Sequence, residues 1–218
     1  MHRPHPLRLR QHGISLISLM VGLAISMIVI LATLMLFQRT IRATTEARRD
    51  AQADAQRSSA FLSAGIAVQE AGYWIENAQL GNHLIVLANA NLNNSTLSGN
   101  SVGLGNSGNA VVWTENSTGI ERCSALLAPN GEGEGGLLKL GPVPCSDATS
   151  FADLTWDAKS LAIFPSAVIS IMAQAADCSP FGVFNETSAN KIRLTFSASN
   201  SNGVVLNSSS CLLNISAS

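Results

Sequence analysis

The residues of this chain that could do chemistry are few and scattered. A G-x-G-x-x-G pattern runs from Gly103 to Gly108, and an S-x-x-K pattern runs from Ser188 to Lys191. A dinucleotide site needs a strand before the glycines and a helix N-terminus after them. Here an Asn/Ser-rich stretch precedes them and strand-like residues 111–113 follow. The serine pattern needs a helix start, but a strand-like segment begins at Lys191 and no K-T-G follows. Neither pattern predicts a site.

Acid–base and metal chemistry has as little support. Beyond residue 12 the only histidine is His83, so a catalytic triad has a single candidate base. We interpret His83 as a surface or strand-edge residue. Glu132 and Glu134 lie in a Gly-rich loop, and two carboxylates are few for calcium. No C-x-x-C motif occurs. We therefore expect a protein that is not an enzyme and holds no metal and no cofactor.

The four cysteines are better placed for disulfides than for metal. They are Cys123, Cys145, Cys178 and Cys211, all in the second half of the chain. An even number at wide spacing predicts two disulfides formed in an oxidising compartment. Sequence neighbours suggest Cys123–Cys145 and Cys178–Cys211, although four cysteines allow three pairings.

Charge excludes one class of partner. The net charge is −1 and 12% of residues are charged, which argues against a nucleic-acid partner because such proteins usually carry a basic patch. Three of the cations, Arg3, Arg8 and Arg10, precede Gly13, and no acidic residue does. Loss of the first 13 residues would lower the net charge from −1 to −4.

A long uncharged segment follows Gly13. Residues 14–37 are 24 residues without a charge, and a helix of that length spans roughly 36 Å, enough to cross a bilayer. A secretory signal peptide fits poorly, because its apolar core is about 7–15 residues long and leads directly to a cleavage site. Arginines flank both ends of the segment, so charge leaves its orientation ambiguous. The cysteines favour a C-terminal part outside the cytoplasm.

The basic leader, the glycine and the sequence I-S-L-I-S-L-M together resemble the class III signal of type IV prepilins. The resemblance implies that a membrane peptidase cuts after Gly13 on the cytoplasmic face and methylates the new N-terminus at Ile14. The apolar helix then stays on the mature chain. Most pilins have a glutamate five residues into the mature chain, which is thought to pair with the N-terminal amine of a neighbouring subunit. Ser18 stands there in this chain.

Ser18 has two interpretations. An unpaired carboxylate inside an apolar segment costs a few kcal/mol, and Ser18 avoids that cost but forgoes the pairing. One interpretation is a low-copy subunit at or near a pilus tip, where one neighbour is missing. The other is that serine is simply tolerated and assembly proceeds regardless.

The helix is expected to continue past the apolar segment. No proline occurs between Pro6 and Pro129, and residues 39–57 are mostly good helix formers. Alternating charges, including Asp54 and Arg57, predict a solvated face there. An apolar stripe at steps of three and four then predicts a face that packs on a core. Its members are Phe61, Ala64, Val68, Ala71, Ile75 and Ala78.

The segment Ala71-Gly72-Tyr73 adds a second resemblance, to the PilW-like minor pilins. With the leader and the apolar helix, it covers about residues 8–75. Beyond residue 80 no motif carries the resemblance.

The remainder is expected to be β-rich. Residues 89–109 are rich in Asn, Ser and Gly and predict a polar loop. The segment 201–203 suggests a hairpin turn. Residues 168–172 could be strand or a helical turn. We expect Trp74, Trp113 and Trp156 to be buried or half-buried. Short strands are expected at 83–87, 110–114, 137–140, 154–156, 161–164, 191–196, 204–206 and 212–215.

These patterns predict an α+β, pilin-like fold in which a long N-terminal helix, membrane-spanning first and amphipathic second, packs on an antiparallel sheet. The expected parts are a removed leader (1–13), a membrane half-helix (14–38), an amphipathic half-helix (39–80) and a periplasmic or extracellular domain with two disulfides (81–218).

The resemblance implies a minor pilin that takes part in type IV pilus assembly, in a priming or tip complex. Its partners would be other minor and major pilins, the prepilin peptidase and the assembly machinery of the bacterial inner membrane. The protein would lie in that membrane before assembly and at the cell surface in the pilus afterwards. The alternatives are a minor pseudopilin of a type II secretion system and a membrane-anchored, adhesin-like module that binds through the Asn/Ser/Gly loop.

Overall fold

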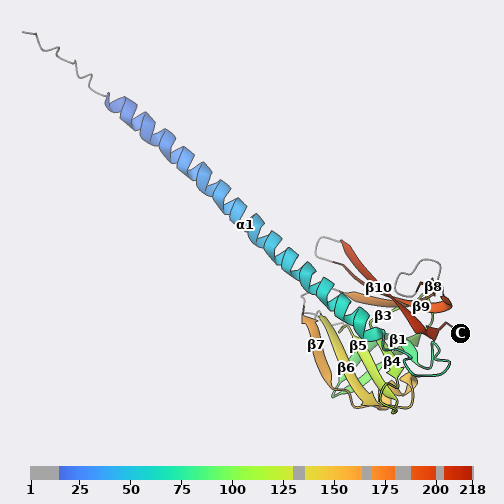
Figure 1. The fold of residues 1–218 in the computed structure, drawn as a ribbon. Coiled ribbons are helices and arrows are strands. Elements are labelled where there is room, and N and C mark those ends of the chain that lie inside the picture. Colours follow the sequence, from blue (N-terminus) through green and yellow to red (C-terminus); the bar gives the residue numbers. More distant parts are fainter. Residues whose placement is uncertain (1–14, 130–135, 164–167, 180–187, 200–203, 218) are drawn as a thin grey trace, which may run out of the picture. The chain divides into compact units, whose positions relative to one another are not determined.

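A single long helix and two antiparallel sheets make up the described chain (Figure 1). The computed structural model describes residues 15–129, 136–163, 168–179, 188–199 and 204–217. Helix α1 spans Leu16–Val68. The chain divides into two compact units, Met1–Arg49 and Asp50–Ser218, and α1 contributes to both.

Helix α1 ends at Val68, and the chain leaves the right-handed conformation at a glycine soon afterwards. After Val68 the backbone continues in turns with i to i−3 hydrogen bonds, such as Ala71 N to Val68 O at 3.1 Å. Gly72 then adopts a φ of 71°, and its N–H donates to the carbonyl of Thr114 at 2.8 Å. The helix therefore ends before residue 80, where the sequence pattern would carry it.

The larger sheet has six strands, and every neighbouring pair in it is antiparallel. In spatial order they are β2 (Thr96–Val102), β1 (Leu84–Asn93), β4 (Ala110–Glu115), β5 (Arg122–Leu127), β6 (Gly136–Pro144) and β7 (Ala158–Ile163). A short 3₁₀ helix, η1 (Ala148–Asp153), lies in the connection from β6 to β7.

The smaller sheet has four antiparallel strands. In spatial order they are β10 (Val205–Ser216), β9 (Ser188–Ser199), β8 (Ile169–Cys178) and β3 (Ser107–Gly108). Figure 1 shows the two sheets on either side of the last turns of α1.

Two apolar clusters form the core of the second unit, one on each face of the six-stranded sheet. The first joins that sheet to the smaller sheet and to α1, whose Phe61 ring lies 6.0 Å from the Phe196 ring of β9. The second lies on the opposite face, where Trp156 and η1 cover Leu87 and Leu127. Because both faces of β4 are covered, all six of its residues are buried.

The predicted stripe marks the buried side of α1 and of the turns after it. Five members, Phe61, Ala64, Val68, Ala71 and Ala78, are at most 2% exposed, and Ile75 packs on them while partly buried. The helix approaches β10 closely at Gly65, where a Cβ would lie 2.8 Å from the Ser210 hydroxyl oxygen.

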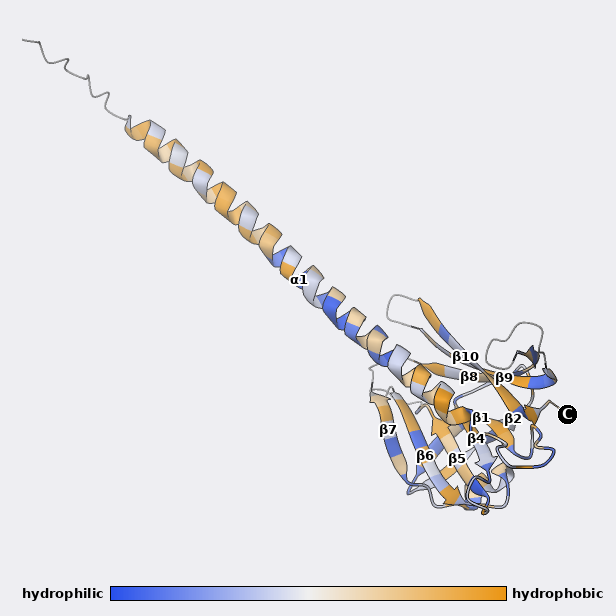
Figure 2. Cartoon of the chain, in the orientation of Figure 1, coloured by the Kyte–Doolittle hydropathy of each residue, from blue (hydrophilic) through white to orange (hydrophobic). Residues whose placement is uncertain are grey.

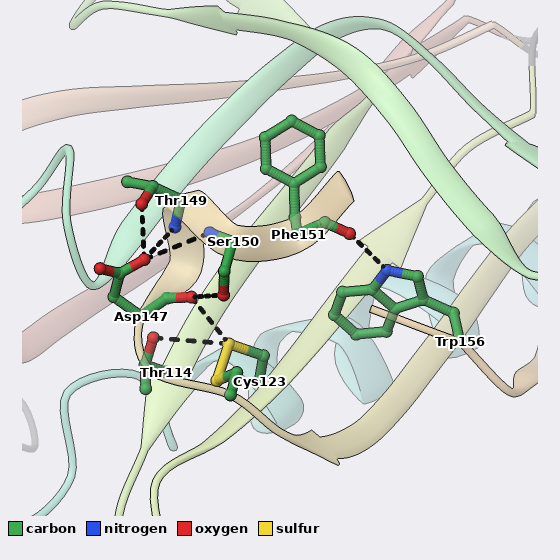
Figure 3. Close-up of a disulfide and its surroundings, with 8 residues drawn as sticks. Thr114, Cys123, Asp147, Thr149, Ser150, Phe151 and Trp156 are labelled. Atoms are coloured by element: carbon green, nitrogen blue, oxygen red, sulfur yellow. Dashed lines mark hydrogen bonds between the residues drawn. A yellow bond between two sulfur atoms is a disulfide. The ribbon is translucent and has the colours of Figure 1, made fainter. Parts of the chain in front are cut away.

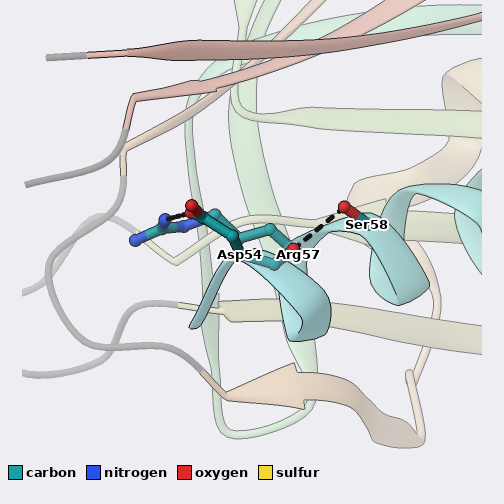
Figure 4. A network of polar contacts seen from close by, with 3 residues as sticks. All are labelled: Asp54, Arg57 and Ser58. Carbon is teal, nitrogen blue, oxygen red and sulfur yellow. Dashed lines mark hydrogen bonds and ion pairs between the residues drawn. The ribbon is translucent and has the colours of Figure 1, made fainter. Parts of the chain in front are cut away.

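The predicted solvated face is wrong at Arg57, which is 5% exposed (Figure 4). Its Nη1 donates to Asp54 Oδ1 at 2.6 Å, and the hydroxyl of Ser58 donates to the carbonyl of Asp54 at 2.9 Å. The exposed carboxylate of Asp54 thus forms an ion pair with the guanidinium of Arg57, which is buried in the second unit.

The strand predictions are confirmed at 84–87, 110–114, 137–140, 161–163 and 191–196, whereas 205–206 and 212–215 belong to one strand, β10. The prediction at 154–156 is wrong, because that segment is an irregular stretch that leads Trp156 into the core. Residues 169–172 are strand. The predicted turn at 201–203 lies outside the described residues, although β9 and β10 on either side of it pair antiparallel.

The polar loop expected at 89–109 is largely strand. β1 extends to Asn93, β2 follows after a two-residue turn, and Leu97 of β2 is fully buried. At its end Asn109 is 5% exposed and bonds to two other segments. Its Nδ2 donates to the carbonyls of Ala90 at 2.8 Å and Ala128 at 2.9 Å, and its Oδ1 accepts from Ala90 N at 2.7 Å. These bonds satisfy buried backbone groups that strand pairing does not.

Candidate functional site

The first part of α1, up to Phe37, consists mostly of hydrophobic residues (Figure 2). The large apolar residues from Leu16 to Phe37 are all at least 51% exposed. The hydroxyls along this segment bond to the carbonyls of their own helix, for example Ser26 to Gly22 at 2.7 Å and Thr33 to Ile30 at 2.8 Å. With those polar groups satisfied internally, the helix is suited to lipid or to packing against other helices. It is also long and apolar enough to cross a membrane.

The residues that the prepilin resemblance marks lie at the front of this helix. Gly13 and Ile14 fall outside the described residues. Ser18 lies in the first turn of α1 and is exposed.

The first disulfide joins Cys123 of β5 to Cys145, with Cα atoms 5.6 Å apart. Cys123 is fully buried, and its sulfur lies 3.2 Å from the carbonyl oxygen of Asp147 (Figure 3). The Asp147 carboxylate caps η1 by accepting from the backbone N–H groups of Thr149 and Ser150 at 2.9 and 3.2 Å. The disulfide and the cap together hold the segment that closes the second core.

That same segment is fixed at its far end by a tryptophan. The indole N–H of Trp156 donates to the carbonyl of Phe151 at 2.9 Å (Figure 3). The second disulfide joins Cys178 of β8 to Cys211 of β10, with Cα atoms 6.0 Å apart. Both pairings are therefore those suggested by sequence neighbours.

The glycine pattern at 103–108 has a packing role. Gly108 lies in β3, next to β1, and a Cβ there would overlap the carbonyl oxygen of Leu87. Gly105 has a φ of 77° and donates its N–H to the carbonyl of Ala173 at 2.8 Å. Strand β4 follows the motif, so no helix N-terminus faces it.

The other candidate residues also have structural surroundings. Ser188 and Lys191 lie at the start of β9 and not on a helix. His83 is half-buried beside β1, and its Nδ1 accepts from the backbone N–H of Gln79 at 3.2 Å. Glu132 and Glu134 fall outside the described residues. Among the residues that are described, no three His, Cys, Asp or Glu side chains gather as a metal site would require.

The tryptophans divide into two kinds. Trp113 and Trp156 are buried as predicted, at 0% and 2% exposure. For Trp74 the prediction is wrong, since its side chain is 75% exposed.

The Ala-Gly-Tyr segment before Trp74 combines burial with close backbone contact. Ala71 is 1% exposed. A Cβ on Gly72 would lie 2.7 Å from Cδ1 of Ile215 and 2.9 Å from Cβ of Ala78. Tyr73 follows with 48% of its side chain exposed. Only glycine combines this close approach with the positive φ at position 72.

A comparison with known protein families finds a match in the first unit of the chain. Residues 8–34 match the prokaryotic N-terminal methylation motif. No curated protein and no solved structure matches the chain. The long helix and the antiparallel sheets form an α+β protein of pilin-like architecture, and the motif with the apolar segment of α1 supports membrane anchoring.

More specifically, the motif supports a structural protein of the type IV pilin or pseudopilin kind. The match spans the N-terminal segment alone, so it carries no information on the sheets.

Proposed function

We propose that this protein is a minor pilin that takes part in type IV pilus assembly, in a priming or tip complex. The observation that carries the proposal is the methylation motif at residues 8–34, which includes the start of a helix whose apolar side chains are exposed. Two environments can bury the apolar side chains of such a helix: a bilayer and a bundle of similar helices. Assembly transfers it from the first to the second, where packing between helices replaces packing against lipid.

Processing follows from the same segment. The peptidase cuts between Gly13 and Ile14 and then methylates Ile14. The cut removes the three leading arginines and leaves the helix on the mature chain. The first unit anchors the protein in the bacterial inner membrane. The second unit, with its two disulfides, lies in the periplasm before assembly and at the cell surface in the pilus.

Intact mass spectrometry of the full chain, produced with a prepilin peptidase, tests this processing. We expect a mature chain that begins at methylated Ile14. Gly13→Val should block the cut. Gly22→Ala, at a glycine of the same helix where an added Cβ would meet no atom within 4 Å, should be processed normally. A chain that keeps its thirteen leading residues beside an active peptidase overturns the proposal.

Ser18 supports a low copy number. In the first turn of an exposed apolar helix it presents no carboxylate to a neighbouring amine. A subunit at or near the tip needs fewer such pairings than a shaft subunit. Quantitative immunodetection in sheared pili should therefore find the protein far below the major subunit, and near-equal amounts would contradict the tip role.

A pseudopilin of a type II secretion system carries the same motif and helix. Deletion of the gene separates the two functions, because loss of pili with normal protein secretion identifies the pilin and the reverse identifies the pseudopilin. The adhesin-like alternative has less support, because most of the polar segment 89–109 through which it would bind lies in strands β1 and β2.

A further inference from the structure

The second unit has a groove beside the end of α1. Its volume is about 550 Å³, and the end of α1 with the turn after it forms one wall. Strands β4, β5 and β6 form the other wall. The residues that line the groove include Ile66, Glu70, Tyr73, Glu115, Arg122 and Lys139.

An exposed apolar patch adjoins the groove on the helix side. Leu62 and Ile66, four residues apart on one face of α1, are 66% and 64% exposed. Trp74 lies against Tyr73 in an edge-to-face contact, with ring centroids 6.1 Å apart, and is 75% exposed. Large exposed aromatic side chains next to a pocket are the residues that most often dominate binding between proteins.

The backbone holds these aromatic residues in place. Gly72 donates its N–H to Thr114 O at 2.8 Å, and Tyr73 O accepts from Asn116 N at 2.9 Å, so the segment is fixed to the end of β4. Trp74 has a φ of 56°, a conformation that bulky L-residues avoid. The chain thus adopts an unfavourable conformation to present a side chain that its own core does not use.

The strand wall of the groove carries two cations, Arg122 and Lys139, and one carboxylate, Glu115. Arg122 faces Glu115 across β4 and β5, and its Nη2 donates to Pro142 O at 3.2 Å. Lys139 of β6 lies directly opposite Lys159 of β7. Like charges at opposing positions destabilise a sheet. Within the part of the chain that the structure describes, neither lysine has a carboxylate partner in an ion pair.

The carboxylates of the groove point to a protein as the occupant. Glu115 is 6% exposed and accepts from Ser117 N at 2.7 Å, and Glu70 stands on the helix wall. Two carboxylates disfavour the anionic headgroups of a bilayer. A polypeptide can place an apolar side chain beside Ile66 and Tyr73 and a carboxylate beside Lys139.

We propose that the patch of Leu62, Ile66, Tyr73 and Trp74, with the adjoining groove, is the docking surface for a different subunit of the assembly. That partner inserts an apolar side chain against Tyr73 and Trp74 and presents an aspartate or glutamate to Lys139. The inference rests on the proposed function for the identity of the partner as another subunit with an N-terminal methylation motif.

Photo-crosslinking of the full chain in its own cells tests the docking surface. Trp74 is replaced by p-benzoylphenylalanine, and the adduct formed under ultraviolet light is identified by mass spectrometry. We expect an adduct with another protein that carries the methylation motif. Lys139→Glu should lower its yield at least about tenfold, and Arg193→Glu, a charge reversal at an exposed position of β9, should not. Intact disulfides and unchanged protein level confirm that both variants fold.

A charge swap makes the test specific. An acidic residue of the partner, mapped in the adduct and changed to lysine, should restore crosslinking to the Lys139→Glu chain. The inference is overturned by an adduct with lipid, with a second copy of this chain or with a protein that lacks the motif, and by the absence of any adduct. If one of these results is found, but the mature chain begins at Ile14 and deletion of the gene abolishes pili, the docking surface is wrong and the proposed function stands.

Discussion

Replacing Asn109 by alanine tests how the second unit holds its sheets together. The substitution removes three hydrogen bonds and leaves the N–H and carbonyl of Ala90 and the carbonyl of Ala128 without those partners. The site is 5% exposed, so water replaces the lost bonds poorly. At about 1 kcal/mol for each bond, the free energy of unfolding should fall by about 3 kcal/mol. For a domain of this size that lowers the melting temperature by roughly 6–12 °C.

The assay is urea unfolding of the full chain in detergent, followed by the fluorescence of Trp113 and Trp156, which are both buried. Asn91→Ala is the matched control, because Asn91 is an exposed asparagine of β1, and its loss should change the free energy by less than about 0.5 kcal/mol. If Asn109→Ala and Asn91→Ala unfold at the same urea concentration, the three bonds do not stabilise the fold as we argue.

Three further predictions concern the packing and one of the disulfides. Gly108→Ala should destabilise by about 1–3 kcal/mol or prevent folding, because its Cβ would overlap a carbonyl oxygen of β1, whereas Gly103→Ala has room and should be close to neutral in a thermal melt. Phe61→Ala should cost about 3–5 kcal/mol, since the ring is 1% exposed, and its exposed neighbour Leu62→Ala should cost far less; equal losses in urea unfolding would contradict the assigned face of α1. Reduction of the disulfide between β8 and β10, which closes a separation of 33 residues, should lower stability by about 3–4 kcal/mol, and an unchanged melt in reductant would refute that estimate.

Helix α1 was predictable because its signals are local. A long uncharged segment and a stripe at steps of three and four are properties of neighbouring residues. Where the helix ends was not predictable, because the turn at Gly72 depends on its bond to Thr114, which is 42 residues away. The same contact fixes Trp74 in an exposed position, which no pattern in the sequence indicates.

The strands that were missed have unusual burial. Strand β5 reads Arg-Cys-Ser-Ala-Leu-Leu, and both of its faces are buried, so polar and apolar residues do not alternate. Strand β2 lies at the sheet edge and buries only Leu97, which leaves it with the composition of a loop. The groove could not be predicted from the sequence either, because pairing of β5 with β6 brings Arg122 and Lys139 together and packing of the turn after α1 adds Glu70.

The contact between α1 and β10 has a mechanical consequence. Gly65 accepts a hydrogen bond from the Ser210 hydroxyl at 3.4 Å, and Cys211 beside it is bonded covalently to Cys178. Tension applied along α1 therefore reaches β9 at Phe61 and β10 at Gly65, and the cross-link joins β10 to β8 in addition to the ladder of β9. A subunit pulled by its helix would have a covalent bond next to one of the contacts through which the sheet is loaded.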